Sequence, residues 1–281
     1  ITFISKKEGL PNGFPLPIAT GVEHYNKGPH IHEYLKEFRH DVLNHYDCFV
    51  VGESPMTGAD DALSFTEGQD KELDMMISFD HMQADCFMTD TISTPFKLYG
   101  RAWNALYLEN HDHPRIISRY GNEKFRNESG KMLATMCYMQ SGTPFIYQGQ
   151  EIGMLNNHLD SIDKFKDVVT FNNQRLFKKF GFSDKKYLEI ANKTSRENAR
   201  TPVQWDSSEY GGFSTAEPWF GVNPNYTEIN VAQQEKDPDS ILNYYRKLLK
   251  VRKENPIIIY GDYEEHYHES NEIYCYERSF N

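Results

Sequence analysis

Two carboxylates stand where apolar runs end, and their type and position suggest a chemistry. Glu53 closes the run "DCFVVGE", and Asp112 closes the run "NALYLENHD". Hydrolysis of a glycosidic bond uses two carboxyl groups, one that gives a proton and one that attacks the anomeric carbon or activates water. Each residue alone is more typical of a turn, because Glu53 precedes Ser54 and Pro55, and Asp112 precedes Pro114. Two such carboxylates at strand ends favour catalysis modestly.

Asp112 lies between two histidines, His111 and His113, whose spacing allows more than one interpretation. Alternate residues of a strand share a face, so the pair could bind a metal ion. No second set of His, Asp or Glu stands at a spacing typical of metal ligands, and we therefore expect no metal site. His111 remains either a hydrogen-bonded structural residue or a ligand contact.

The segment "SRENARTPVQWD" places Arg196 and Arg200 four residues apart, on one face of the chain if the segment is helical. An ion pair with Glu197, or a plain surface role, is the simpler interpretation of these arginines. Aromatic residues follow in the same region. Most aromatics are core residues, but near a sugar site some would form a stacking platform. These residues are Trp205, Trp219 and Phe220.

Short apolar runs rich in Val, Ile, Phe and Tyr recur along the chain, and they predict the elements that position these residues. We expect strands within residues 47–54, 74–82, 104–112 and 142–153. Each run ends in polar residues, which are Glu53, then Asp80 and His81, then Asn110 to Asp112, then Gln148, Gln150 and Glu151. Helical stretches between strands indicate a parallel sheet, and in parallel α/β folds catalytic groups sit at the carboxyl ends of the strands.

Two helices are the clearest of these stretches. Residues 127–142 predict a helix that ends near Gly142, with an apolar face made of Met132, Leu133, Met136, Cys137 and Met139. Residues 237–256 predict another, with Pro238 in its first turn, Lys and Arg at its end, and Pro256 as its stop.

Two further regions differ in character. Residues 257–267 and 271–281 predict two strands of an antiparallel unit. Residues 154–236 are polar and irregular, too long for a plain connection, and we interpret them as a functional excursion.

Composition excludes several classes of function. The net charge of -11, from 41 acidic against 30 basic residues, disfavours nucleic acid or an anionic membrane as a partner and suits a neutral ligand such as a sugar. No apolar run reaches the roughly 20 residues of a membrane helix. The four cysteines form no CxxC pair, which argues against a zinc site or a disulfide framework, and we expect Cys48 and Cys137 in the core. The first residues show no signal peptide, and we expect a cytoplasmic location.

Five motifs occur in order along nearly the whole chain: "VVGES", "LENHDHPRIISRYG", "GTPFIYQGQEIGM", "SRENARTPVQWD" and "PWFGVNPNYTEINV". Together they resemble glycoside hydrolase family 13, in particular its oligo-1,6-glucosidase, α-glucosidase and trehalose-6-phosphate hydrolase group. The resemblance implies an α/β fold in which residues 1–256 are the C-terminal half of a TIM (β/α)8 barrel, strands 5 to 8, with the excursion after strand 8. Residues 257–281 would begin an all-β C-terminal domain.

The resemblance also implies roles for single residues. Glu53 matches the general acid/base at the end of the fifth strand. Asp112 matches the carboxylate at the end of the seventh strand, which holds the sugar hydroxyls and stabilises the transition state. His111 matches a substrate contact beside it. Arg196 and Arg200 match arginines that line the glucose pocket.

Two departures from the family pattern stand out. The nucleophile of the family is an Asp at the end of the fourth strand, and Ile1 begins just after its place, so we expect the nucleophile and the first four strands to be absent from this chain. The family also places a helix between the sixth and seventh strands, where residues 83–103 show no helical period. We expect a segment to be missing between Leu98 and Tyr99.

These observations lead to one expected function and two alternatives. We expect the full-length parent to hydrolyse α-glucosidic bonds of short oligosaccharides with retention, as a monomer, with no cofactor in this chain. Trehalose-6-phosphate hydrolysis is the close alternative, but it needs a compact cluster of Lys and Arg that the sequence does not show. A non-catalytic barrel that serves as a scaffold or binding module is the other alternative, which Glu53 and Asp112 disfavour.

The first prediction concerns the 281-residue chain on its own. Half a barrel leaves two strand edges unpaired and exposes the apolar faces that the missing strands would cover, so we expect this chain to dimerise or aggregate and to be inactive. Adding the upstream half should restore a monodisperse particle and glucosidase activity. Size-exclusion chromatography with an assay on isomaltose and maltose measures both. A stable monomer that cleaves either sugar without the upstream half would contradict the prediction.

Overall fold

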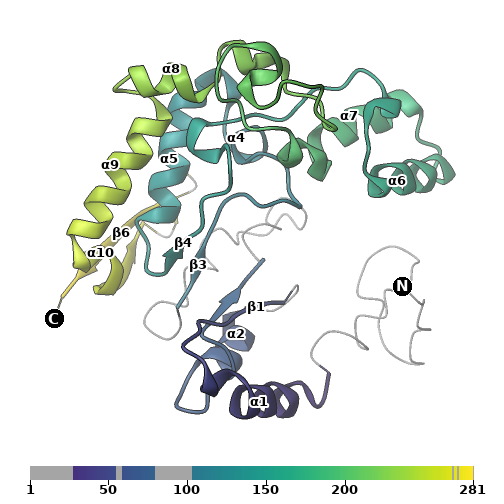
Figure 1. The fold of residues 1–281 in the computed structure, drawn as a ribbon. Coiled ribbons are helices and arrows are strands. Elements are labelled where there is room, and N and C mark those ends of the chain that lie inside the picture. The colour runs from purple at the N-terminus through teal and green to yellow at the C-terminus, as the bar shows by residue number, and fades with distance from the viewer. Residues whose placement is uncertain (1–27, 55–58, 80–102, 268, 271, 281) are drawn as a thin grey trace. The chain divides into compact units, whose positions relative to one another are not determined.

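A computed structural model describes residues 28–54, 59–79, 103–267, 269–270 and 272–280 of the chain (Figure 1). The described residues up to Ala105 form one compact unit, and those from Leu106 form a second. Each unit is an α/β arrangement, and the strands within the described residues do not close a barrel. None of the helices in this part of the chain combines the length and the apolar run that crossing a bilayer requires. Asp80, His81 and the junction at Leu98 and Tyr99 lie outside the described residues.

The first unit is built on a pair of short parallel strands. Its elements are α1 (Ile31–Asp41), η2 (Leu43–His45), β1 (Val51–Glu53), α2 (Ala59–Thr66) and β2 (Met75–Ile77). In the register of the strands, Val51 faces Met75 and Glu53 faces Ile77. A parallel bridge continues from Met76 to Asn104. The pairing confirms the parallel sheet predicted from the sequence. Both strands are shorter than the apolar runs from which they were predicted.

Asp74 ties α1 and β1 together in the first unit. Its carboxylate accepts hydrogen bonds from Arg39 Nη2 and from the main-chain N–H of Val50, each at 2.8 Å, and lies 2.9 Å from Lys71 Nζ. Its own N–H donates to the carbonyl of Val50 at 2.9 Å. A small apolar core lies beside these contacts and contains Ala62, Leu63, Phe65, Leu73 and Met76. The strand that carries Glu53 is therefore fixed at its start by one partly buried carboxylate.

Strand β3 (Ala105–Leu106) spans the boundary between the units and pairs with β4 (Thr143–Pro144) of the second, where Phe145 N donates to Leu106 O at 2.7 Å. Between these strands and just after them lie α4 (Ile116–Tyr120), η6 (Glu123–Phe125), α5 (Arg126–Tyr138) and η7 (Gln150–Ile152). The excursion holds η8 (Ile162–Lys164), α6 (Val168–Lys179), α7 (Asp184–Thr194), η9 (Arg196–Arg200), η10 (Glu209–Gly212), η11 (Pro224–Thr227) and α8 (Val231–Lys236). The chain continues with α9 (Ile241–Glu254), α10 (Pro256–Tyr260) and an antiparallel pair, β5 (Asp262–His266) and β6 (Cys275–Ser279).

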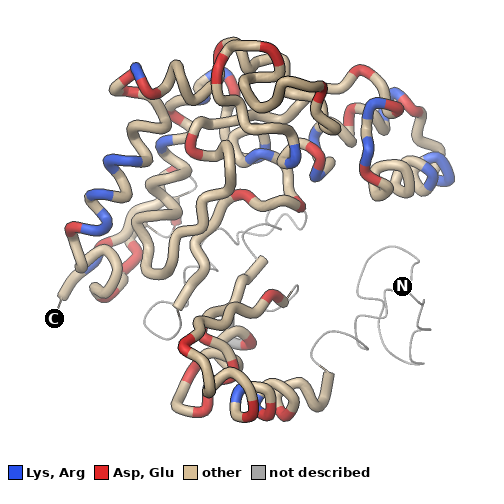
Figure 2. The backbone as a smooth tube through the Cα atoms, viewed as in Figure 1, with Lys and Arg blue, Asp and Glu red and all other residues tan. Residues whose placement is uncertain are grey.

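Helices α5 and α9 pack side by side and form the core of the second unit (Figure 1). The helices approach each other at Gly130, where a Cβ atom would lie 2.8 Å from Ile241 Cδ1, so a larger residue would require Ile241 to shift. Lys and Arg recur along α9 in Figure 2, yet Arg252 is buried. Its guanidinium donates to the carbonyls of Tyr138 (2.8 Å), Gln140 and Gly142 (2.5 Å), and so satisfies carbonyl groups at and just beyond the end of α5.

The predicted helices and the antiparallel pair are confirmed, with corrections in detail. Helix α5 ends at Tyr138 with Met139 as its cap, so Gly142 lies beyond the helix and not at its end. Helix α9 begins at Ile241 because the Ser240 side chain caps it and accepts from Asn243 N at 3.2 Å, so Pro238 lies ahead of the helix. Residues 257–259 are helical in α10, since Pro256 stands at its first position, and the strand begins only at Asp262.

Two side chains also depart from the expected core. Met132 is exposed rather than part of the apolar face of α5, while Leu133 and Cys137 are buried as predicted. Cys48 is exposed, so the prediction that it belongs to the core is wrong. It lies outside the buried cluster of the first unit, and its thiol donates to the Leu43 carbonyl at 3.7 Å.

Asp74 generates a prediction about acid stability. Burial disfavours its ionised form, but hydrogen bonds from Arg39, Lys71 and Val50 outweigh this and lower its pKa to about 2 from 3.8. A depressed carboxyl pKa contributes stability above the unfolded value, here about 2 kcal/mol, which is lost as pH falls through the folded value. Asp74→Asn should therefore lower the free energy of unfolding near pH 7 by about that amount, and the difference from wild type should vanish near pH 2.

Urea unfolding of the full-length protein at several pH values measures this difference. Asp239→Asn is the control, because that carboxylate pairs with Lys131 but is 91% exposed, and it should change stability little at any pH. A gap between wild type and Asp74→Asn that stays constant from pH 7 to pH 2 would contradict the assignment.

Candidate active site

A tight turn after β3 presents His111 and Asp112 to solvent. The side-chain oxygen of Asn110 accepts from Asp112 N at 2.9 Å and lies 2.9 Å from His113 Nδ1. These bonds fold the turn back on itself, and they assign His113 to the turn. The side chains of His111 and Asp112 remain 66% and 41% exposed, with His111 Nε2 at 3.4 Å from Asp112 Oδ2.

A buried ion pair between Glu109 and Arg115 joins the two ends of this turn. Arg115 Nη1 donates to Glu109 Oε2 at 2.9 Å and to the Gln148 carbonyl at 2.8 Å, while Glu109 Oε1 accepts from Ile116 N at 2.8 Å. Burial raises the pKa of Glu109, and the Arg115 guanidinium opposes that rise. Gly149 beside the arginine has a φ of +86°, and a Cβ atom there would lie 2.3 Å from Met154 Sδ and 3.3 Å from Arg115 Nη1.

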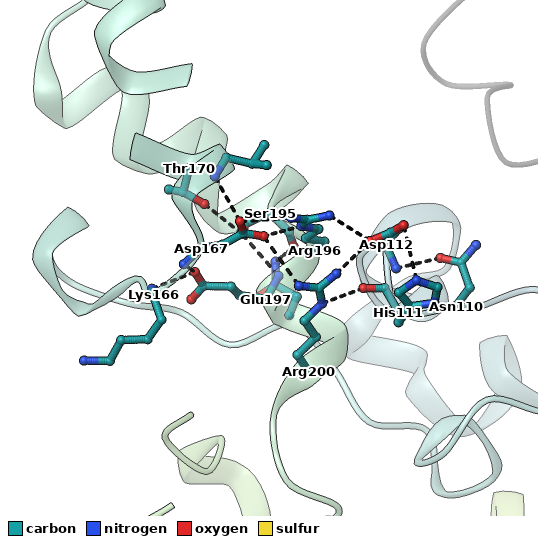
Figure 3. A network of polar contacts seen from close by, with 12 residues as sticks. Asn110, His111, Asp112, Lys166, Asp167, Thr170, Ser195, Arg196, Glu197 and Arg200 are labelled. Carbon is teal, nitrogen blue, oxygen red and sulfur yellow. Dashed lines mark hydrogen bonds and ion pairs between the residues drawn. The ribbon is translucent and has the colours of Figure 1, made fainter. Parts of the chain in front are cut away.

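The two arginines of the excursion meet Asp112 (Figure 3). Arg196 Nη1 and Arg200 Nη2 both donate to Asp112 Oδ1, at 3.0 and 2.7 Å, and Arg200 Nε donates to the carbonyl of His111 at 2.8 Å. Both arginines lie on the 3₁₀ turn η9, which Ser195 caps through the N–H of Glu197. The structure thus brings together His111, Asp112, Arg196 and Arg200, which the sequence singled out from segments more than 80 residues apart.

Asp167 lies behind the arginines and was missed by the sequence analysis. Its side chain is 4% exposed and accepts two hydrogen bonds from Arg196, from Nε and from Nη2, the latter at 3.0 Å. It also caps α6 by accepting from Val169 N at 2.9 Å. The Arg196 hydrogen bonds lower the pKa of Asp167, and Asp167 in turn raises that of Arg196. An Asp just before a helical run is a cap signal in the sequence, but its pairing with Arg196 is not.

Glu197 points away from Asp112. Its carboxylate accepts from the main-chain N–H groups of Lys166, at 2.6 Å, and Asp167, and its burial raises its pKa. The simpler interpretation of Arg196 and Arg200, an ion pair with Glu197, therefore gives way to pairing with Asp112 and Asp167. Glu197 anchors the segment that leads into α6.

The remaining sequence candidates lie in different settings. Glu53 is the exposed last residue of β1, within the first unit. Gln150 is buried and donates to the hydroxyls of Tyr138 and Tyr245, each at 2.7 Å, so it belongs to the core. Trp205 and Trp219 are exposed; Trp219 packs on Phe220 with ring centroids 4.6 Å apart, and Phe220 borders a pocket of about 30 Å³. Among the described residues, no group of three or more His, Cys, Asp and Glu is arranged to hold a metal ion.

Comparison with known proteins identifies the class. The catalytic domain of the alpha-amylase family matches residues 1–261. The chain therefore belongs to the alpha-amylase family of glycoside hydrolases, family 13, as its motifs predicted.

The chain is similar in sequence or structure to three known enzymes. The oligo-1,6-glucosidase of Bacillus cereus is 41% identical over 305 residues, which cover 100% of this chain and 54% of that enzyme. The crystal structure of the trehalose-6-phosphate hydrolase of Bacillus licheniformis is 40% identical, with a TM-score of 0.85 over 93% of this chain and 50% of that one. An isomaltulose synthase variant from Erwinia rhapontici, solved with its natural substrate sucrose, is 36% identical, with a TM-score of 0.84 over 92% of this chain and 50% of that one.

This chain spans about half the length of these relatives. The alignment with the Bacillus cereus enzyme runs over 305 residues, more than the 281 of this chain, so that enzyme carries residues with no counterpart here.

The buried ion pair under the turn generates a stability prediction. Arg115→Met leaves Glu109 buried without its partner, and losing one member of such a pair costs roughly 3 to 5 kcal/mol. The double variant Glu109→Gln with Arg115→Met should be less destabilised than Arg115→Met alone, because no charge is then left buried. Urea unfolding of the full-length protein gives the free energies.

Arg246→Met is the matched control for this test. Arg246 pairs with Glu235, and both side chains are about half exposed, so its loss should leave stability unchanged within error. The assignment of Arg115 as the support of the turn is wrong if Arg115→Met unfolds at the same urea concentration as Arg246→Met.

Proposed function

We propose that the protein to which this chain belongs hydrolyses α-glucosidic bonds of short oligosaccharides with retention of configuration. One observation carries the proposal: an exposed carboxylate at the end of a strand, Asp112, is held by Arg196 and Arg200 with His111 beside it. A fixed carboxylate among hydrogen-bond donors suits a ligand of hydroxyl groups, and it suits the positive charge that develops on the sugar ring in the transition state.

The roles follow from this arrangement and from the family. Glu53, at the carboxyl end of β1, serves as general acid and then as base. Asp112 holds sugar hydroxyls and stabilises the oxocarbenium-like transition state, with His111 as a further contact. Retention needs a second carboxylate as nucleophile, and we place it in the half of the relatives that this chain does not span.

The same proposal covers the architecture around the site. We propose that residues 1–256 are the second half of a TIM barrel and that residues 257–281 begin an all-β domain, whose first strand starts at Asp262 after the helical turn α10. The protein works as a cytoplasmic monomer on a small sugar, and this chain contributes no cofactor ligand.

Trehalose-6-phosphate hydrolysis is the second candidate, favoured by the 40% identity to the Bacillus licheniformis enzyme, which nearly equals the 41% identity to the Bacillus cereus enzyme. A phosphate would need basic groups of its own, and here Arg196 and Arg200 are committed to Asp112 and Asp167. Turnover of isomaltose, maltose and trehalose 6-phosphate, compared side by side in the full-length protein, distinguishes the two candidates. A non-catalytic scaffold would hydrolyse none of them.

Glu53→Gln tests the proposed acid/base. In the full-length protein this change should lower kcat on isomaltose or maltose by about 10² to 10⁴-fold, because general acid catalysis supplies a factor of that size. The fold should persist, since Glu53 is exposed at the end of its strand. Glu37→Gln, on the exposed side of α1, is the control and should keep wild-type turnover. Turnover by Glu53→Gln at the wild-type rate on an unactivated disaccharide would remove Glu53 from the role.

A further inference from the structure

Arg196 divides its donors between two carboxylates. The edge that carries Nε and Nη2 faces Asp167, which accepts from both atoms, while Nη1 donates to Asp112. A guanidinium bound along one edge by a carboxylate has a fixed plane, so the direction of its remaining N–H groups is fixed as well. The buried carboxylate of Asp167 thus determines where Nη1 of Arg196 points.

Arg200 is held in a related way. Its Nη1 lies 3.6 Å from Asp167 Oδ2, its Nε donates to the His111 carbonyl, and its Nη2 donates to Asp112 Oδ1. One buried anion therefore stands behind two arginines whose outer N–H groups meet at the same oxygen (Figure 3).

The two oxygens of Asp112 are used unequally. Oδ1 accepts from both arginines, at 3.0 and 2.7 Å, whereas Oδ2 lies 3.4 Å from His111 Nε2. One oxygen is thus bound within the protein, and the other lies on the side of the exposed His111 ring. The carboxylate is oriented without both of its oxygens being taken up by the arginines.

We propose that Asp167 is a positioning residue of the active site: it holds Arg196 and Arg200 so that both bind Oδ1 of Asp112 and leave Oδ2 for a sugar hydroxyl. This inference rests on the proposed function. Without the charge of Asp167, Arg196 can turn and bind both oxygens of Asp112, which places the arginine in competition with the substrate.

The helix cap made by Asp167 can be separated from this positioning role. Capping of α6 uses one acceptor for Val169 N, and Asn and Ser serve about as well as Asp at that position. Asn keeps the size of the side chain but removes the charge that binds the guanidinium edge. Ser keeps the cap but is too short to hold Arg196. Both variants therefore keep α6 capped while they remove the positioning contact.

The test uses Asp167→Asn and Asp167→Ser in the full-length protein, assayed on isomaltose and maltose. Losing hydrogen bonds between charged groups that orient Asp112 should lower kcat/KM by about 10- to 100-fold, with a higher KM because Arg196 then competes with the substrate and a lower kcat because Asp112 also acts on the transition state. Ser183→Ala is the control. It removes the side-chain cap of α7, which accepts from Lys186 N at 3.2 Å, and should leave kcat/KM unchanged.

A double-variant cycle separates positioning from a merely structural role. Because Asp167 acts mainly through Arg196 and holds Arg200 at the longer distance of 3.6 Å, Asp167→Asn combined with Arg196→Met should lose far less kcat/KM than the product of the two single losses. Losses that multiply in the double variant, or wild-type kcat/KM in both Asp167 variants, would overturn the inference while leaving the proposed function intact. A wild-type protein that cleaves no α-glucoside would instead overturn the proposed function.

Discussion

The buried ion pair between Glu109 and Arg115 is the interaction on which the described site depends. Two charges removed from water are tolerated only when each finds partners, and here the carboxylate also binds a main-chain N–H while the guanidinium also binds the carbonyl of Gln148. The N–H belongs to Ile116, which follows the turn, and the carbonyl of Gln148 lies beyond β4. The pair therefore fixes the turn to the strand region, and the direction of His111 and Asp112 follows from it.

The long excursion returns to that same turn. Its irregular sequence gives short helices joined by capped turns, and its 3₁₀ turn η9 delivers two arginines to Asp112. Length and polarity led to the interpretation of residues 154–236 as a functional excursion. Its arginines contact Asp112, so the segment reaches the candidate site. Between its helices this segment has few regular hydrogen bonds of its own, so side-chain contacts such as those of Asp167 and Glu197 hold the connecting stretches in place.

Much of this arrangement could be predicted from the sequence, for identifiable reasons. Val, Ile, Phe and Tyr runs that end in polar residues located all four strands. The apolar face of residues 127–142, and the basic residues and Pro256 at the end of residues 237–256, located the two main helices. Local rules failed where another local rule was stronger: Ile257 to Ile259 favour a strand, but Pro256 starts a helical turn. The position of Cys48 depends on packing around it, which an apolar run does not reveal.

The pairing of Asp167 with Arg196 could not be predicted, because it joins residues 29 apart through a fold that no periodicity encodes. Arg252 shows a second such long-range contact, and it has a consequence for how the second unit opens. Its guanidinium, carried by α9, occupies carbonyls at and beyond the end of α5. Fraying of α5 from that end must break bonds to α9, and unwinding of α9 past Arg252 strips α5 of its donors. We therefore expect the two helices to open as a single cooperative unit, with amide hydrogens that exchange with solvent together.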